Sequence, residues 1–211
     1  MAFNKKELDN SFKSIMIDGF KFKKEIMGFS WTKEYSNRIE KIIIGYRGYP
    51  DSYVAYTPTA SVYFEEVERF LLESFNKTGI VSRWGDTGTI TKAFVNLQDV
   101  DYSVFNTEIN NEARFMKVAT EIEKIINAGA LPFFEKYNTL EKIWEESEKM
   151  ALEEMANFIG QPLPQRRMII KKLCKDPQFE EYAKMVVDFY EKEKDQDVPI
   201  VKQLYHDLKA V

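Results

Sequence analysis

The spacing of apolar residues changes once along this chain, near Leu97. Before that point, apolar and polar residues mostly alternate, which is the period of two that a half-buried strand requires. After it, apolar residues recur every three or four positions, as on one face of a helix. The early strands follow one another without helices between them, which indicates antiparallel pairing. The change of period therefore predicts an α+β fold, with a mixed first half and a helical second half.

The first half is expected to contain one helix, then a sheet of about four to six strands packed by helices. Asn4 can cap the first helix, and Gly19 is a typical stop signal. Pro58 interrupts the run of strands, and Gly79 ends a second helix over residues 64–76. The predicted strands are residues 20–23, 29–32, 38–46, 53–56 and 89–97.

The second half is expected to be helical throughout, with proline and glycine as punctuation. Thr139 is placed to cap a helix that Gly160 stops. No strand is expected after Leu97, and the remaining predicted helices are residues 108–126, 132–137, 177–190 and one that starts near Pro199. We expect one α+β domain over residues 1–138 and a helical extension over residues 139–211.

Charge and cysteine content limit the environment and the partners of the chain. Its 211 residues carry a formal net charge of −4, so no overall positive field would steer it to nucleic acid. Nucleic acid is therefore an unfavoured partner. The single cysteine, Cys174, cannot form an intrachain disulfide, which fits a reducing compartment. The first residues lack the apolar segment of a signal peptide, and no apolar run is long enough to span a bilayer. The expected location is the cytoplasm.

Motifs of known catalytic chemistry are not found in the sequence. There is no phosphate-binding glycine loop, no serine nucleophile motif and no paired cysteines or histidines. His206 is the one histidine, and we expect an ordinary helical residue. Cys174 lies among lysines but also among apolar residues, so burial is favoured over reactivity. We expect no catalytic residue, no metal site and no cofactor.

A basic stretch surrounds Cys174; it consists of Arg166, Arg167, Lys171, Lys172 and Lys175. Arg167, Lys171 and Lys175 are four residues apart and would form one stripe on a helix. Such a stripe could bind phosphate or an acidic protein, but it is more often a solvated face. The acidic residues of the preceding helix, which include Glu148, could balance it.

The most unusual local feature is a tyrosine-rich hairpin with the sequence GYRGYPDSYVAY, residues 45–56. Tyrosine and arginine are enriched at the hot spots of protein–protein interfaces, and tyrosines also stack on bases in some RNA-binding sheets. Tyrosine also favours strands for its packing alone. The candidate binding residues in this hairpin are Tyr46, Arg47, Tyr49 and Tyr53.

A second candidate binding segment is the loop over residues 83–88. Its polar and aromatic residues beside two glycines suit a ligand-binding loop, and equally a tight connection whose tryptophan packs on the core. The candidate residues are Arg83, Trp84 and Asp86.

Two segments resemble a group of small bacterial proteins of unknown function. The first is GFKFKK, residues 19–24, with residues 29–33 after it, and the second is GALPFFEKYNTLEK, residues 129–142. The second resembles the LPxFEKY-type helix of that group. The resemblance covers about residues 1–145 and implies a helix, then an antiparallel sheet, then helices. It also implies a bacterial origin and an immunity or accessory role, and it supplies no catalytic residue.

Three functions remain open from the sequence. The favoured one is a protein-binding module without catalytic activity, such as an immunity protein whose acidic balance suits a basic toxin. The first alternative is a hydrolase-like enzyme with carboxylates such as Glu65, Glu66 and Asp86. The other is an RNA-binding protein that uses the tyrosine-rich sheet.

Overall fold

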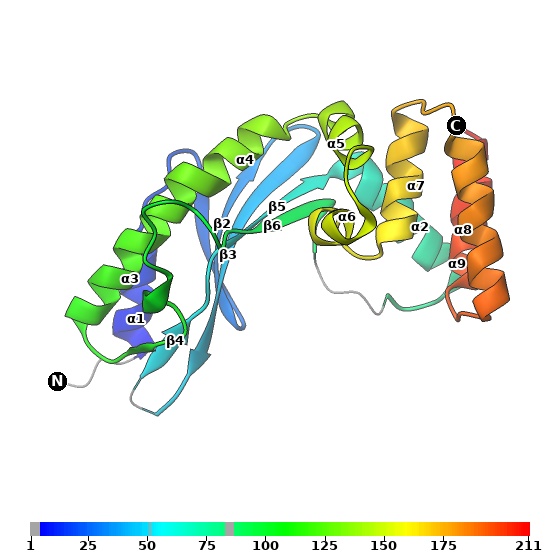
Figure 1. The fold of residues 1–211 in the computed structure, drawn as a ribbon. Helices are drawn as coiled ribbons and strands as arrows, with labels where there is room; N and C mark the ends of the chain where they lie inside the picture. Colours follow the sequence, from blue (N-terminus) through cyan, green and yellow to red (C-terminus); the bar gives the residue numbers. More distant parts are fainter. Residues whose placement is uncertain (1–4, 51, 83–86) are drawn as a thin grey trace. The chain divides into compact units, whose positions relative to one another are not determined.

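The strands form an antiparallel sheet whose order is β1-β2-β3-β4-β7, with β5 on β3 and β6 on β5 (Figure 1). The computed structural model describes residues 5–50, 52–82 and 87–211. Within these residues the predicted α+β class is confirmed, with an N-terminal helix, an antiparallel sheet and a helical C-terminal region. The strands are β1 (Lys21–Glu25), β2 (Gly28–Glu34), β3 (Arg38–Gly48), β4 (Tyr53–Ala55), β5 (Thr59–Phe64), β6 (Ile90–Ala93) and β7 (Glu108–Ile109).

Two of these strands were not predicted. Strand β5 follows Pro58 directly, and it is largely buried on both faces, so its sequence does not alternate. Strand β7 has two residues, which is too short for any periodic signal, and it lies where a helix was predicted. That helix begins only at Glu112, because Asn111 caps it by accepting a hydrogen bond from the backbone N–H of Arg114.

By its internal packing the chain forms two units, each made of two stretches of sequence. The first unit comprises Met1–Ser61 and Lys92–Lys136, and the second comprises Val62–Thr91 and Tyr137–Val211. The predicted boundary at residues 138–139 lies close to the one between Lys136 and Tyr137. Residues 62–91, which the prediction assigned to the first segment, pack with the C-terminal helices.

The first unit packs α1 (Lys5–Ser14) and α3 (Glu112–Ile125) against one face of its sheet. Phe12 of α1 stacks on Phe29 of β2 at 4.4 Å between ring centroids and meets Phe115 of α3 edge-on at 5.2 Å. The indole N–H of Trp31 donates a hydrogen bond to the carbonyl of Ile15. This aromatic layer is the core of the unit, and it fixes which face of the sheet is covered.

Helix α3 continues past its predicted end through a π-helical turn, Ile126–Ala130, into α4 (Leu131–Lys136). The predicted end of this helix at residue 126 is wrong, because the backbone N–H of Leu131 bonds to the carbonyl of Ile126 five residues back. Pro132 has no N–H to donate, and the wider turn lets the chain continue past it.

A short 3₁₀ helix, Tyr102–Val104, precedes β7.

The second unit is a helical assembly in which α2 packs against α7 and α9, and α8 packs against both α7 and α9 (Figure 1). The predicted αL cap of α2 is confirmed, since Gly79 has φ of 67° and its N–H bonds to the carbonyl of Asn76. The helix predicted between Thr139 and Gly160 is two helices, α5 and α6. The helices of this unit are α2 (Glu65–Thr78), α5 (Leu140–Ser147), α6 (Leu152–Phe158), α7 (Leu163–Leu173), α8 (Phe179–Glu193) and α9 (Val198–Lys209). No helix in the described part of the chain is both long and apolar enough to cross a membrane.

The basic stretch on α7 is not the solvated face that was expected. Arg166 and Lys171 are buried, Arg167 is half-buried, and of the predicted stripe only Lys175 is exposed. Lys171 lies 2.9 Å from Glu148 and 2.6 Å from Asp176, and Arg167 lies 3.1 Å from Glu148. The acidic balance expected from Glu148, which is itself exposed, is confirmed, and the buried Asp176 is a second acidic partner of Lys171.

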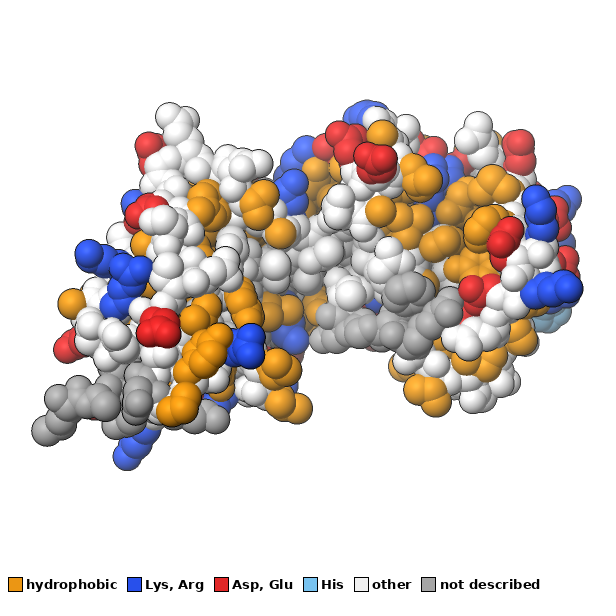
Figure 2. Space-filling view, turned by 60° about the horizontal axis from the view of Figure 1, so that its bottom comes forward, with side chains coloured by type: hydrophobic (Ala, Val, Ile, Leu, Met, Phe, Trp, Pro, Cys, Tyr) orange, Lys and Arg blue, Asp and Glu red, His pale blue; other side chains and the backbone are white. Residues whose placement is uncertain are grey.

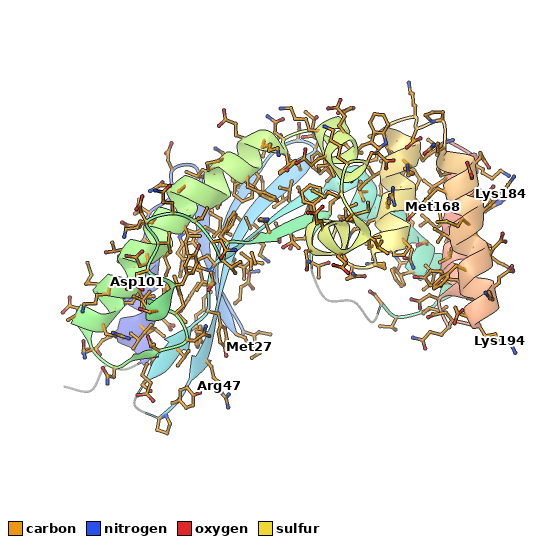
Figure 3. The ribbon with its side chains drawn as sticks, viewed as in Figure 1. Met27, Arg47, Asp101, Met168, Lys184 and Lys194 are labelled. Carbon is orange, nitrogen blue, oxygen red and sulfur yellow. The ribbon has the colours of Figure 1, made fainter. Side chains whose placement is uncertain are left out.

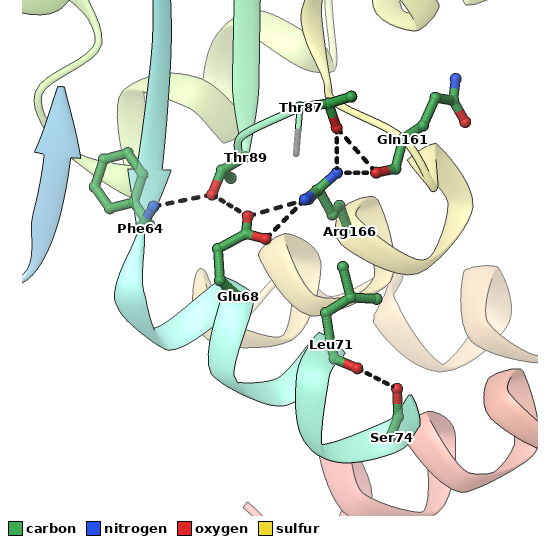
Figure 4. Close-up of polar contacts among 8 residues, drawn as sticks. All are labelled: Phe64, Glu68, Leu71, Ser74, Thr87, Thr89, Gln161 and Arg166. Carbon is green, nitrogen blue, oxygen red and sulfur yellow. Dashed lines mark hydrogen bonds and ion pairs between the residues drawn. The ribbon is translucent and has the colours of Figure 1, made fainter. Parts of the chain in front are cut away.

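A second buried network surrounds Arg166 (Figure 4). Its guanidinium donates two hydrogen bonds to the two carboxylate oxygens of Glu68, at 3.1 and 2.7 Å. Thr89 donates to the same carboxylate and accepts from the backbone N–H of Phe64. Arg166 also donates to the hydroxyl of Thr87 and to the carbonyl of Gln161. These contacts tie α2, α7 and the segment before β6 together within the second unit.

Candidate interaction surface

Strand alternation divides the four candidate residues of the tyrosine-rich hairpin into two groups. Tyr46 and Tyr53 point to the face that α1 and α3 cover, and they are 7% and 8% exposed. Their rings meet edge-to-face at 6.0 Å, and Tyr46 also stacks on Phe29. These two tyrosines are therefore part of the core wall, as packing alone would explain.

The hydroxyl ends of these tyrosines lie near an ion pair between Lys24 of β1 and Asp9 of α1. The hydrogen bond to Asp9 raises the pKa of Lys24. Burial, followed by the nearby Tyr46 and Asp9, raises the pKa of Tyr53. The Oδ1 atom of Asp9 is buried and makes no hydrogen bond with a residue that the structure describes. This cluster fastens α1 to the sheet.

Arg47 lies on the opposite face of the sheet. It is paired with Val54 of β4, and Val54 is paired with Glu108 of β7, so the three residues form one row across three strands. Arg47 and Glu108 are exposed and Val54 is half-buried. The guanidinium carbon of Arg47 lies 5.3 Å from the ring centroid of Tyr49, which is within cation–π range.

Two exposed apolar side chains lie in the turn that neighbours β3, at the Arg47 end of this row. The turn between β1 and β2 carries Ile26 and Met27, which are 98% and 73% exposed. The carbonyl of Met27 accepts a hydrogen bond from the N–H of Tyr46, which places the turn next to β3. Figure 3 shows Met27 and Arg47 at the same end of the sheet. In Figure 2, where this end comes forward, hydrophobic side chains lie around a basic one.

Tyr56 completes the group. Its N–H donates a hydrogen bond to the carbonyl of Gly45. Its ring lies over that glycine, since a Cβ atom added to Gly45 would lie 3.1 Å from the ring. Tyr56 is 42% exposed and Tyr49 is 41% exposed. We call this group the hairpin surface; it consists of Ile26, Met27, Arg47, Tyr49, Val54, Tyr56 and Glu108.

Ile26 and Met27 are not among the binding residues predicted from the sequence. The available signal was two consecutive apolar residues in a turn, between the strand sequences KFKKE and GFSWTKE. Turn residues are usually polar or glycine, so an apolar pair there is informative. Glu108 was missed because β7 was not predicted.

The other candidate residues do not join this surface. Arg83, Trp84 and Asp86 lie outside the described residues. Glu65 and Glu66 are exposed at the start of α2, where Glu66 lies 4.0 Å from Arg69 on the same helix. Among the residues that the structure describes, no group of three or more histidine, cysteine, aspartate or glutamate side chains is arranged to hold a metal ion.

Cys174 and His206 match the structural roles expected for them. His206 is exposed on α9. Cys174 is half-buried, and burial, reinforced by Glu141 and Asp176, raises the pKa of its thiol to about 12. At neutral pH the reactive thiolate is therefore scarce.

Comparison of the chain with models of protein families, with characterised proteins and with solved structures gives no match.

Proposed function

We propose that this protein is a binding module that contacts another protein through the hairpin surface, without catalysis of its own. The observation that carries the proposal is the exposure of Ile26, Met27 and Tyr49 next to an exposed arginine. Scattered apolar residues on a surface need no explanation, but a contiguous apolar group marks an interaction site.

The composition of the surface supports a protein partner. Tyrosine and arginine supply much of the binding energy at protein interfaces. Arg47 is held over Tyr49, so less side-chain freedom is lost when its N–H groups bind an acceptor. Burial of one large aliphatic side chain such as Ile26 contributes about 1.5–3 kcal/mol.

The RNA-binding alternative has less support. Two of the tyrosines it requires, Tyr46 and Tyr53, have their rings against Phe29 and each other. The exposed face offers Arg47 as a cation, but Glu108 in the same row would repel phosphate. An immunity or accessory role, with a basic partner that the negative net charge would suit, is the alternative form of the proposal.

Site-specific photo-crosslinking in cells tests the proposal. Tyr49 is replaced by benzoylphenylalanine, and the same replacement at Met185, an exposed residue of α8, is the control. We expect a discrete adduct from position 49 that position 185 does not give.

The protein in that adduct is then purified and titrated against the unmodified chain. We expect Met27→Asp and Tyr49→Ala each to weaken binding at least about tenfold. The first substitution places a charge in the apolar contact, and the second removes the aromatic ring. Met185→Asp should leave affinity unchanged. Equal binding by all four chains, or the absence of any adduct specific to position 49, would contradict the proposal.

A further inference from the structure

The row of Arg47, Val54 and Glu108 has opposite charges at its two ends and an apolar residue at its centre. Neighbouring strands are about 4.8 Å apart, so the two charged positions are about 10 Å apart on the face of the sheet. Neither charged side chain forms an ion pair with a residue in the described part of the chain. A row of this kind is complementary to itself after rotation by 180°.

We infer that the hairpin surface binds a second copy of this chain, face to face, about a two-fold axis. The axis runs parallel to the strands and passes over Val54. Rotation about it reverses the row, so Arg47 of each copy lies opposite Glu108 of the other, and the two Val54 side chains meet. This inference rests on the proposed function, and it names the partner.

The arrangement satisfies the requirement of an isologous interface, in which residue i contacts residue j and residue j contacts residue i. The Arg47–Glu108 ion pair therefore forms twice per dimer, from one row of three residues in each copy. Arg47 is exposed and lies within cation–π range of Tyr49, so it is available for a carboxylate of the second copy. A partner of one charge sign would satisfy one end of the row and be repelled by the other.

Sedimentation velocity of the full chain at about 1–200 µM tests the inference. The surface is small, so we expect a reversible dimer with a Kd on the order of 10 µM or weaker. Arg47→Glu and Glu108→Arg should each weaken dimerisation at least about tenfold, because each places like charges opposite one another twice.

The double variant Arg47→Glu/Glu108→Arg restores both pairs with reversed signs, and we expect its Kd to return to within about threefold of the original. Lys184→Glu, an equal charge reversal on the exposed side of α8, is the matched control and should not change the Kd (Figure 3). Circular dichroism and thermal unfolding confirm that each variant is folded. Because all three substituted side chains are exposed, we expect them to fold normally.

Two outcomes overturn the inference. One is a chain that remains monomeric at 200 µM, and the other is a dimer whose Kd the double variant does not restore. The crosslinking experiment separates these failures from failure of the proposed function. An adduct of position 49 with the same chain supports both proposals. If position 49 gives an adduct with a different protein and the chain sediments as a monomer, the dimer inference is wrong. The proposal that the hairpin surface binds another protein is then still supported.

Discussion

The ammonium nitrogen of Lys171 lies 2.6 Å from a carboxylate oxygen of Asp176, and these two side chains are 2% and 4% exposed. The same oxygen of Asp176 accepts a hydrogen bond from the indole N–H of Trp144, and its other oxygen accepts one from the backbone N–H of Gln178. The pair joins the end of α7 to the turn before α8. Two charges are stable inside the unit only because these additional donors and Glu148 complete their hydrogen bonding.

Removal of the lysine charge should destabilise the second unit. In Lys171→Met, the carboxylate of Asp176 stays buried without its counter-ion, and we expect a loss of about 3–5 kcal/mol in the free energy of unfolding. Urea denaturation followed by circular dichroism measures the loss. Lys184→Met on the exposed side of α8 is the control, with a change below about 0.5 kcal/mol. A loss below about 1 kcal/mol in Lys171→Met would show that the buried pair does not stabilise the fold.

Stability should fall in acid partly through Asp176. Burial alone would raise the pKa of Asp176, but the hydrogen bonds from Lys171, Gln178 and Trp144 outweigh burial and lower it. A carboxyl whose pKa is lowered by folding stabilises the protein above its unfolded pKa, near 4, and this contribution is lost as the pH falls through the folded pKa. The difference in unfolding free energy between the natural chain and Asp176→Asn should therefore narrow from about pH 5 to about pH 3. A constant difference over that range would contradict the assignment.

Arg166 should not be replaceable by lysine. Its fork makes two hydrogen bonds to Glu68 and further ones to Thr87 and Gln161, and a lysine cannot reproduce that geometry. We expect Arg166→Lys to lower the free energy of unfolding by about 2–4 kcal/mol. Arg69→Lys is the matched control, because Arg69 makes its ion pairs with Glu66 and Glu73 on the exposed face of α2, and its loss should stay below about 0.5 kcal/mol. Equal losses in the two variants would count against the network.

Gly28 should be intolerant of any side chain. A Cβ atom there would lie 2.4 Å from the carbonyl oxygen of Ile44, which belongs to the backbone of the neighbouring strand and cannot rotate away. We expect Gly28→Ala to cost about 1–3 kcal/mol. Gly48→Ala, where the nearest atom is 3.3 Å away in the ring of Tyr53, should cost less than about 1 kcal/mol. Thermal unfolding compares them, and equal midpoints would refute the steric argument.

Cys174 should react slowly in the folded protein. Burial holds the pKa of its thiol at about 12, so at pH 8 the thiolate fraction is far below that of a free cysteine. We expect its reaction with Ellman's reagent at pH 8 to be at least about 100-fold slower in the folded chain than in urea. Comparable rates would mean that the thiol is accessible and ionised in the fold.

Helix ends and strands were predicted correctly where a single local feature of the sequence is decisive. Gly79 ends α2 because the αL conformation is readily accessible to glycine, and Thr139 caps α5 by accepting from the backbone N–H of Lys142. Strands β2 and β3 alternate strictly enough to be recognised. Strand β5 could not be recognised, because burial on both faces removes the alternation, and the π-helical turn could not be, because it depends on which carbonyl Leu131 reaches.

The sequence by itself determined that this chain is an α+β protein, because periods of two and of 3.6 residues are local properties of strands and helices. It did not place Arg47, because the predicted strand over residues 38–46 ends one residue before it, whereas β3 continues to Gly48. Only the tertiary structure decided which face is covered, because that depends on where Phe12 and Phe115 pack. The same holds for Arg166, whose partner Glu68 is 98 residues away in sequence. Long-range packing determines which side chains remain in water. In the tyrosine-rich hairpin these include Arg47, Tyr49 and Tyr56, and Ile26 and Met27 are exposed in the neighbouring turn.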